Sequence, residues 1–381
     1  MIDFGLSSQQ FFSDYHERRY FLRRGALDCA HYSWQDINDL LYVVEPRAPF
    51  MRVFQDGPVE EARYAEDYAD MGLPRRRLRK HAFYELLEQG ATVVLNRLEV
   101  ASAKLRRLSM DVSSFAGANA IVNGYLAYGG DGTFGKHWDT HDVFVVQLLG
   151  RKRWQVFEPT MSLPSRQQTS KDVKEFCPPT PVFDGILEPG DVMYIPRGWW
   201  HEAMPTEGET FHVAIGLHTP TLMDYAVWSC GKYLKDHPEC RRSFRMDDPQ
   251  QNDVEALAAI VAGLLSDRSK LEQFQRDLYE SERISTPLNA ELFSPQTGRD
   301  LDSQSTLLLS ANLRGSASRR FAPINGHLGR RSPEATRIIE LMSRGRPTSL
   351  GTIASQLDDV SPDKVKETVQ QLIKENCLII A

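Results

Sequence analysis

Two histidines and one aspartate have the types and order that can hold a catalytic metal ion. His137 and Asp139 form a His-x-Asp pair, and His201 follows later in the chain. Two imidazoles and one carboxylate are the facial triad that binds non-haem Fe(II) and leaves coordination positions open. A His-x-Asp triplet alone is more often a chance surface or core sequence. The setting of His201 makes a metal site the preferred interpretation.

Two predicted elements would bring these residues together. We expect residues 137–149 to form a strand, in which side chains two positions apart share a face, so His137 and Asp139 would converge. The turn Pro196-Arg197-Gly198 follows a short apolar stretch and precedes His201. His201 would therefore lie at the start of a strand, at the mouth of a barrel.

Composition is that of an ordinary soluble enzyme. The chain has 381 residues, 41% hydrophobic and 25% charged, which predicts two or three domains. A net charge of -6 argues against bulk polyanion binding. The 5 cysteines form no C-x-x-C pair and indicate neither a disulfide framework nor a zinc ribbon. We see no membrane-length apolar run and no signal segment, so we expect a cytoplasmic protein with no membrane role.

The pattern of apolar residues divides the chain into three zones. Residues 1–220 contain many short β-type runs separated by Gly and Pro turns, which favours a barrel or sandwich of α+β class. Residues 221–302 are helical, with apolar residues at helical spacing over 254–265. In residues 303–381, a polar stretch to residue 331, expected to be a loop, precedes three short helices and a terminal strand. That last pattern resembles a winged-helix unit.

The sequence resembles the JmjC-type ribosomal oxygenases of the cupin superfamily in four segments, residues 123–126, 137–139, 142–154 and 187–198. Gly190-x5-Pro196-x4-His201 has the spacing of the second cupin motif, although Pro205 stands where an asparagine is expected. The resemblance implies an N-terminal double-stranded β-helix barrel, then a helical dimerisation module, then a C-terminal winged-helix domain. It spans nearly the whole chain.

The resemblance implies that His137, Asp139 and His201 bind Fe(II), with 2-oxoglutarate and O2 as cosubstrates. It also implies that Lys152 binds the far carboxylate of 2-oxoglutarate. Strand alternation puts Lys152 on one face with apolar neighbours and agrees with an inward position, because a buried anion needs a charged partner. A solvated hairpin end is the other interpretation of the basic run at residues 151–153.

Three further residues match family positions near the cosubstrate. Tyr125 and Asn123 correspond to positions that line the cosubstrate pocket, and His212 lies near a polar position beside the metal or cosubstrate. Each could instead be a hydrogen-bonded barrel residue. Trp199 and Trp200 offer an aromatic wall beside the metal, or plain core packing. The basic run 75–81 is expected to be a solvated helix face.

The resemblance implies hydroxylation of an Arg or His side chain in a ribosomal protein. Hydroxylation of another peptide, such as a ribosomally made natural-product precursor, and demethylation of N-methyl lysine are alternatives. A non-catalytic cupin sensor is an alternative from another class. From residue 332 to 381 there are six Lys or Arg against seven Asp or Glu, so we expect no direct DNA binding. A homodimer is expected.

Overall fold

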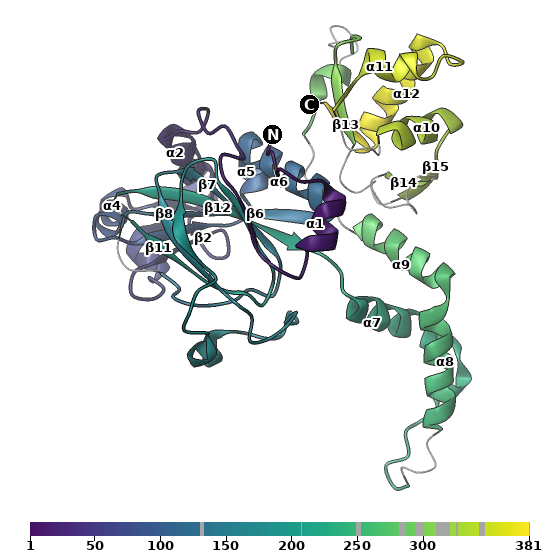
Figure 1. Cartoon of the computed structure of the whole chain (residues 1–381), viewed down its shortest axis with the longest axis horizontal. Helices are drawn as coiled ribbons and strands as arrows, with labels where there is room; N and C mark the ends of the chain where they lie inside the picture. The colour runs from purple at the N-terminus through teal and green to yellow at the C-terminus, as the bar shows by residue number, and fades with distance from the viewer. Residues whose placement is uncertain are drawn as a thin grey trace. The chain divides into compact units, whose positions relative to one another are not determined.

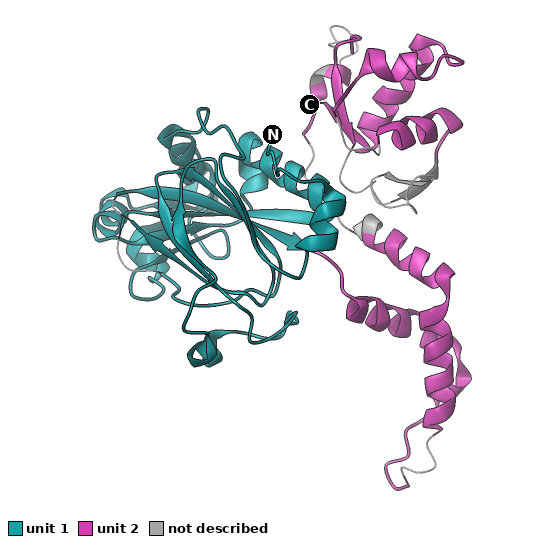
Figure 2. Cartoon of the chain, viewed as in Figure 1, with its two compact units in different colours: residues 1–218 teal, residues 219–381 magenta. Residues whose placement is uncertain are grey.

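The chain forms two compact units, residues 1–218 and residues 219–381, in the computed structural model (Figure 2). The structure describes residues 1–129, 133–206, 208–248, 253–281, 287–293, 301–309, 321–324, 327–342 and 347–380. The first unit holds the predicted barrel and the second holds the predicted helical zone and C-terminal domain. The finer division at residues 220 and 302 stays a prediction.

The first unit is built on two antiparallel sheets and a separate hairpin (Figure 1). The larger sheet has the order β1 (Phe21–Arg23), β10 (Val192–Ile195), β7 (Val143–Leu149), β12 (Thr210–His218), β6 (Asn119–Ala127), β5 (Thr92–Leu95) and β2 (Met51–Phe54). The smaller sheet has the order β11 (Trp200–Pro205), β8 (Lys152–Phe157) and β9 (Phe183–Leu187). The hairpin pairs β3 (Ala65–Asp70) with β4 (Leu73–Leu78).

Strand β7 explains how the core is divided. It is apolar along nearly its whole length because it is buried on both faces. Phe144 and Val146 belong to the large core that the helices cover, whereas Val143 and Val145 belong to a second core with Trp154 of β8. The interior between the two sheets is therefore lined by alternate residues of both.

Helices of the first unit cover the outer face of the larger sheet (Figure 1). Helix α6 is positioned by its ends, where the Ser102 side chain caps the first turn and Gly117 ends the helix with a φ of +65°. The helical segments of this unit are α1 (Ser8–Asp14), α2 (Trp34–Val43), α3 (Glu61–Tyr64), α4 (Lys80–Glu88), α5 (Leu98–Ala101), α6 (Ala103–Ala116) and the 3-10 helix η1 (Lys171–Phe176).

Two predictions about local structure in this unit were wrong. The strand expected from residue 137 begins only at Val143, and His137 forms an isolated bridge with His201 instead. The basic run at residues 75–81 is not one helix face. Its first part lies in β4, where cross-strand acidic partners such as Glu66, opposite Arg77, favour the hairpin.

The second unit begins with helices and ends with a small α+β core. Its helical part comprises α7 (Leu222–Tyr233), η2 (Leu234–Asp236), η3 (Pro238–Arg241), α8 (Val254–Ser266), α9 (Arg268–Ser281) and η5 (Ala290–Phe293). The remaining elements are β13 (Thr306–Leu309), β14 (Phe321–Ile324), β15 (His327–Arg330), α10 (Pro333–Met342), β16 (Thr348–Ser349), α11 (Leu350–Ser355), α12 (Pro362–Lys374) and β17 (Leu378–Ile380). None of the described helices is long and apolar enough to cross a bilayer.

The loop expected over residues 303–331 was also wrong in part, because it contains β13, β14 and β15, although residues 310–320 and 325–326 lie outside the described ones. Strand β13 pairs with both β16 and β17, and α10, α11 and α12 bury their apolar faces with this sheet in one core. The predicted helix starts at Pro333 and Pro362 are confirmed. The assignment as a winged-helix domain stays a prediction.

Gly150 makes the tight turn between β7 and β8, and this turn sets where Lys152 enters the barrel. Its φ is +62°, and a Cβ there would lie 2.1 Å from the carbonyl oxygen of Glu209. Gly117 has nearly the same φ, +65°, but open space around it. The two glycines therefore share a backbone conformation and differ in their surroundings.

Substituting Gly150→Ala should lower the free energy of unfolding by about 2–4 kcal/mol, since both left-handed strain and a steric clash contribute. Gly117→Ala should lower it by only about 1–2 kcal/mol, from the strain alone. Urea denaturation of both variants measures the difference. Equal losses would show that the approach of the Glu209 carbonyl does not constrain this turn.

Candidate metal centre and its cavity

The structure brings His137, Asp139 and His201 together. One ligand atom from each residue lies within 4.8 Å of the others, and Asp139 Oδ2 is 3.6 Å from His201 Nε2. His201 is the second residue of β11, close to the strand start predicted for it. The three residues thus come from two chain segments, one before β7 and one in β11.

Backbone hydrogen bonds hold the two segments in register. The His137 N–H donates to the His201 carbonyl at 3.1 Å, and the His201 N–H donates to the His137 carbonyl at 2.8 Å. The Gly198 N–H donates to the Asp139 carbonyl at 2.9 Å. These bonds, and not the predicted continuous strand, hold His137 and Asp139 beside His201.

Hydrogen bonds also fix which nitrogen of each imidazole faces the centre. Nδ1 of His137 lies 2.9 Å from the Gly135 carbonyl oxygen, and Nδ1 of His201 lies 3.0 Å from that of Trp199. A carbonyl can only accept, so each Nδ1 carries the proton and each Nε2 of the neutral ring keeps a free lone pair. Both rings are therefore ready to bind a metal through Nε2.

The charges of the centre also suit a cation. Burial, followed by the proximity of His137, lowers the pKa of His201, so this imidazole is neutral at pH 7. Burial alone would raise the pKa of Asp139, but the three nearby imidazoles, His201 first, outweigh it and the pKa is lowered. The imidazoles of His137 and His201 and the Asp139 carboxylate form a donor set that fits a divalent transition metal.

A cavity between the two sheets opens at these residues. Its walls come from both sheets and from the segment before His137, and they are Thr92, Tyr125, Thr133, Phe134, Gly135, His137, Asp139, Val143, Val145, Lys152, Trp154, His201, Ala203, His212 and Ala214. Apolar side chains make much of this lining, with a few polar groups among them, which is the usual character of a small-molecule site.

Lys152 lines this cavity, and its side chain is buried, as the strand alternation predicted. Lys152 and Trp154 face inward, whereas the neighbouring Arg153 is exposed and pairs with Asp184 at 2.6 Å. The Lys152 ammonium has no side-chain hydrogen bond or ion pair with any residue that the structure describes. Burial lowers the pKa of Lys152 to about 8. A buried ammonium of this kind suits an anionic ligand.

His212 and Tyr125 form one wall of the cavity. They lie opposite each other on β12 and β6, and their rings stack with centroids 4.9 Å apart. Burial and the charge of Lys152 lower the pKa of His212 well below its usual value, and its Nδ1 has no hydrogen-bond partner among the described residues. Asn123 does not line the cavity, and its side-chain oxygen accepts the Arg97 N–H at 3.4 Å.

The sequence reasoning missed several residues of the lining, among them Trp154, Thr92 and Thr133. Trp154 stands beside His212, with ring centroids 5.3 Å apart, and the Thr133 hydroxyl donates to the Thr92 hydroxyl at 2.6 Å. Alternation of side chains along β8 predicts that Trp154 faces inward, so the sequence did contain a signal for this residue. Nothing in the sequence linked Thr92 with Thr133.

The two tryptophans before His201 pack in cores and do not line the cavity. Trp200 is fully buried with Trp138 and Phe157, and Trp199 belongs to the core between the sheets. The aromatic wall beside the metal, one of the two interpretations of Trp199 and Trp200, is therefore not supported. Core packing, the alternative, is what these residues provide.

Comparison with known proteins agrees with this geometry. Residues 94–225 match the JmjC domain. It is 33% identical over 123 residues to the bifunctional lysine-specific demethylase and histidyl-hydroxylase NO66 of Drosophila persimilis, covering 32% of this chain and 18% of that protein. It is 31% identical over 149 residues to ribosomal oxygenase 2 of Rattus norvegicus, covering 39% of this chain and 30% of that protein. The matches thus span less than a third of either relative.

A solved structure resembles the chain along its whole length. The ribosomal oxygenase YcfD of Escherichia coli, in complex with cobalt and 2-oxoglutarate, matches with a TM-score of 0.57 at 16% identity, over 100% of this chain and 99% of that one. At this identity the likeness concerns the fold. The sequence-based resemblance to the JmjC-type ribosomal oxygenases is confirmed by the domain match, the related sequences and the shared fold.

The lowered pKa of Lys152 gives a test of its burial. A folded-state pKa of about 8 against an ordinary 10.5 means that the protonated side chain destabilises the fold. Below pH 8 this penalty is fully present, and it shrinks as the pH rises from 8 toward 10.5. Replacing Lys152→Met should raise the free energy of unfolding at pH 7 by about 1–3 kcal/mol.

Urea denaturation at several pH values measures this gain, which should decrease above pH 8. The neighbouring variant Arg153→Met is the control, and it should change stability by at most about 1 kcal/mol because its ion pair is exposed. A Lys152→Met protein that is less stable than the wild type would show that the ammonium is not penalised by burial.

Proposed function

We propose that the protein is an Fe(II)- and 2-oxoglutarate-dependent oxygenase that hydroxylates a protein or peptide side chain. One observation carries the proposal: the convergent His137, Asp139 and His201 share a cavity with the buried Lys152, which has no anionic partner among the described residues. The JmjC domain and the cobalt and 2-oxoglutarate complex of the similar E. coli protein support it.

The side chains divide the work. His137, Asp139 and His201 would hold Fe(II), which when bound supplies O2 activation coupled to the decarboxylation of 2-oxoglutarate to succinate. Lys152 would bind the far carboxylate of 2-oxoglutarate by a charge-assisted contact. Tyr125 and His212 would flank the same cosubstrate, whereas the position of Asn123 gives it at most an indirect part. Val143 and Val145 would exclude water from the reacting groups.

The substrate that we favour is an Arg or His side chain of a ribosomal protein. Support comes from the names of the relatives, a ribosomal oxygenase and a histidyl-hydroxylase. Segment 158–182 is a candidate for substrate choice because it contacts the ligand-bearing segment from outside: the Ser170 hydroxyl bonds both the N–H and the carbonyl of Trp138, and Lys174 donates to the Phe134 carbonyl. None of its residues lines the cavity itself.

Anaerobic titration with Fe(II) and 2-oxoglutarate tests the cosubstrate. The wild type should develop the weak visible charge-transfer band of the chelate, and Asp139→Ala should lose both the band and turnover. Lys152→Ala should weaken 2-oxoglutarate binding roughly 30-fold or more, because an unpaired buried charge costs about 2–5 kcal/mol.

Arg153→Ala serves as the matched control, since this neighbouring cation points to the other face of β8 and should leave 2-oxoglutarate affinity unchanged. A wild-type protein that binds metal without forming the chelate would contradict the proposal and favour the sensor alternative. If the chelate forms, mass spectrometry of peptides and ribosomal proteins incubated with the enzyme distinguishes hydroxylation, a gain of one oxygen, from demethylation, the loss of a methyl group.

The helical part of the second unit supports a homodimer. Helix α8 is apolar along most of its length, yet within the chain only Leu264 is buried. Val254 is 60% exposed on this helix, and Leu222 of α7 is 85% exposed. Exposed apolar surface of this kind is typical of an interaction surface, and a second copy of the chain is the partner that the predicted dimerisation module implies.

Light scattering at micromolar concentration should give the mass of a dimer for the wild type and of a monomer for the double variant Val254→Glu, Leu257→Glu, since a buried charge is costly. Glu255→Gln on the same helix is the control and should remain dimeric. A monomeric wild type would remove the proposal.

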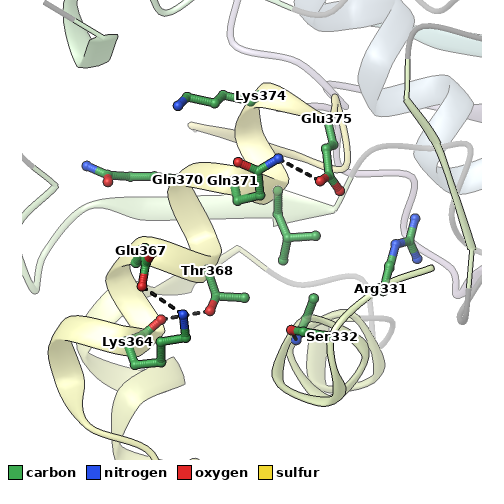
Figure 3. A pocket seen from close by; sticks show the side chains of 11 residues that line it. Arg331, Ser332, Lys364, Glu367, Thr368, Gln370, Gln371, Lys374 and Glu375 are labelled. Carbon is green, nitrogen blue, oxygen red and sulfur yellow. Dashed lines mark hydrogen bonds and ion pairs between the residues drawn. The ribbon is translucent and has the colours of Figure 1, made fainter. Parts of the chain in front are cut away.

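The C-terminal domain is proposed to contact protein and not DNA. Figure 3 shows a groove beside α12 whose charges are of both signs, with Lys364 paired to Glu367 at 2.8 Å. Gln371 donates to Glu375, also at 2.8 Å. A helix that reads DNA normally lies on a basic surface. The mixed charges of this groove do not provide one.

A further inference from the structure

A cluster of four side chains adjoins the two segments that carry the candidate metal ligands, and the proposed chemistry uses none of the four. It consists of His16, Glu17, Asp142 and Arg197. Asp142 and Arg197 come from the two segments that also carry the metal ligands. The other two residues come from the N-terminal segment between α1 and β1.

Asp142 is buried, and it ties three parts of the barrel together. Its Oδ1 accepts the backbone N–H of Arg197 at 2.8 Å, and its Oδ2 lies 3.4 Å from Nε2 of His16. Its own carbonyl accepts the N–H of Leu217 in β12 at 2.8 Å. The side chain therefore links the segment after Asp139 to the turn before β11.

That turn leads to His201 and is held at consecutive residues. The Arg197 N–H is bound by the Asp142 carboxylate, and the next N–H, that of Gly198, is bound by the Asp139 carbonyl at 2.9 Å. Both ends of segment 139–142 are thus bonded to the turn, at the consecutive residues Arg197 and Gly198. Strand β11 begins two residues after Gly198, and His201 is its second residue.

The N-terminal segment supports the same turn from the other side. The Glu17 carboxylate pairs with the Arg197 guanidinium, and the Glu17 N–H donates to the hydroxyl of Tyr194 in β10 at 3.0 Å. His16 faces the second oxygen of Asp142. The arginine turn is therefore fixed through both its backbone and its side chain.

We propose that Asp142 is a positioning residue for the metal centre, which sets the spacing between Asp139 and His201 by holding the Arg197 backbone. Glu17 acts with it through the arginine side chain. This inference rests on the proposed metal site, and it concerns how strongly and in what geometry that site binds metal. Partners that orient metal ligands typically change metal affinity 10–100-fold when removed.

The same cluster has ligand atoms near enough to suggest a second metal site, since one atom each of His16, Glu17 and Asp142 lies within 4.8 Å of the others. The contacts argue against that interpretation. The Glu17 carboxylate is already neutralised by the Arg197 guanidinium, whose positive charge would repel a cation, and Asp142 Oδ1 already accepts an N–H. The Glu17 carboxylate and one Asp142 oxygen thus have partners within the protein and need no metal ion.

Anaerobic titration of metal-free protein with Co(II) tests the proposal without requiring turnover. The wild type should bind one Co(II) per chain, with a ligand-field spectrum. Asp142→Ala should bind about 10–100-fold more weakly with an altered spectrum. Asp142→Asn should stay within about threefold of the wild type, because its amide oxygen can still accept the Arg197 N–H. Should Asp142→Ala not fold, Glu17→Gln, at a partly exposed position, should weaken binding about 2–5-fold.

Asp191→Ala is the matched control. Asp191 is likewise buried and its carboxylate accepts the N–H groups of Gly25 and Glu188 at 3.0 and 2.9 Å, but it lies at the opposite end of β10, away from the ligands. This variant should lose stability and keep the wild-type Co(II) affinity and spectrum.

The outcomes separate the two proposals. A wild type that binds no Co(II) would overturn the proposed function and this inference with it. If Asp142→Ala binds Co(II) as tightly as the wild type, the positioning role alone is overturned. The same holds if Asp191→Ala weakens Co(II) binding as much as Asp142→Ala does. A stoichiometry of two that falls to one in Asp142→Ala would make the cluster a metal site instead.

Discussion

The pair of backbone hydrogen bonds between His137 and His201 is the constraint on which the candidate centre depends. His137 lies in no strand, so its position comes from the bridge to β11 and not from a sheet of its own. Strand β11 is in turn fixed by its pairing with β8 along six residue pairs, from Trp200 opposite Phe157 to Pro205 opposite Lys152. The small sheet therefore positions both Lys152 and the proposed metal ligands. A shift in that pairing would move all of them together.

Burial of Lys152 shows how the fold accommodates a residue that packing alone would not select. Desolvation disfavours its charge, and no described partner offsets that cost. The surrounding strands supply the compensation, since β7 and β10 are apolar and buried on both faces. An anionic ligand with a carboxylate at this end of the cavity would supply the missing partner. Stability and ligand binding thus compete at this position, as is common in functional sites.

Residue type and short-range spacing carried most of the sequence prediction. The ligand set followed from the chemistry of His137, Asp139 and His201, and the inward face of Lys152 followed from alternation along β8. The α+β barrel class, and the helix starts at Pro333 and Pro362, followed from turn residues and periodicity. These are local signals, and each is fixed within a few residues of the position that it describes.

What the sequence did not provide depends on contacts between distant segments. The segment around His137 has an alternating pattern that suits a strand. In the structure it forms only an isolated bridge with His201, and the Asp139 carbonyl accepts the N–H of Gly198 in a turn. Taken alone, the basic residues of β4 resemble one face of a helix. The acidic residues that favour a strand here lie across the hairpin, in β3. Thr92 of β5 meets Thr133, which follows β6, and Asn123 accepts the N–H of Arg97 from a different part of the chain. Long-range register decides each of these cases.

Side chains of both sheets line the cavity, so a ligand bound there would affect the stability of the fold. Tyr125, Val143 and His212 come from the larger sheet, while Lys152 and His201 come from the smaller one. A cosubstrate held by Lys152 at one end and by a metal on the ligand triad at the other would contact both sheets at once. Binding of this kind stabilises the folded state by mass action, since the unfolded chain does not bring these strands together. Asp142 and Arg197 do not line the cavity. Their network can therefore hold the proposed metal-binding residues in place before a metal or a cosubstrate binds.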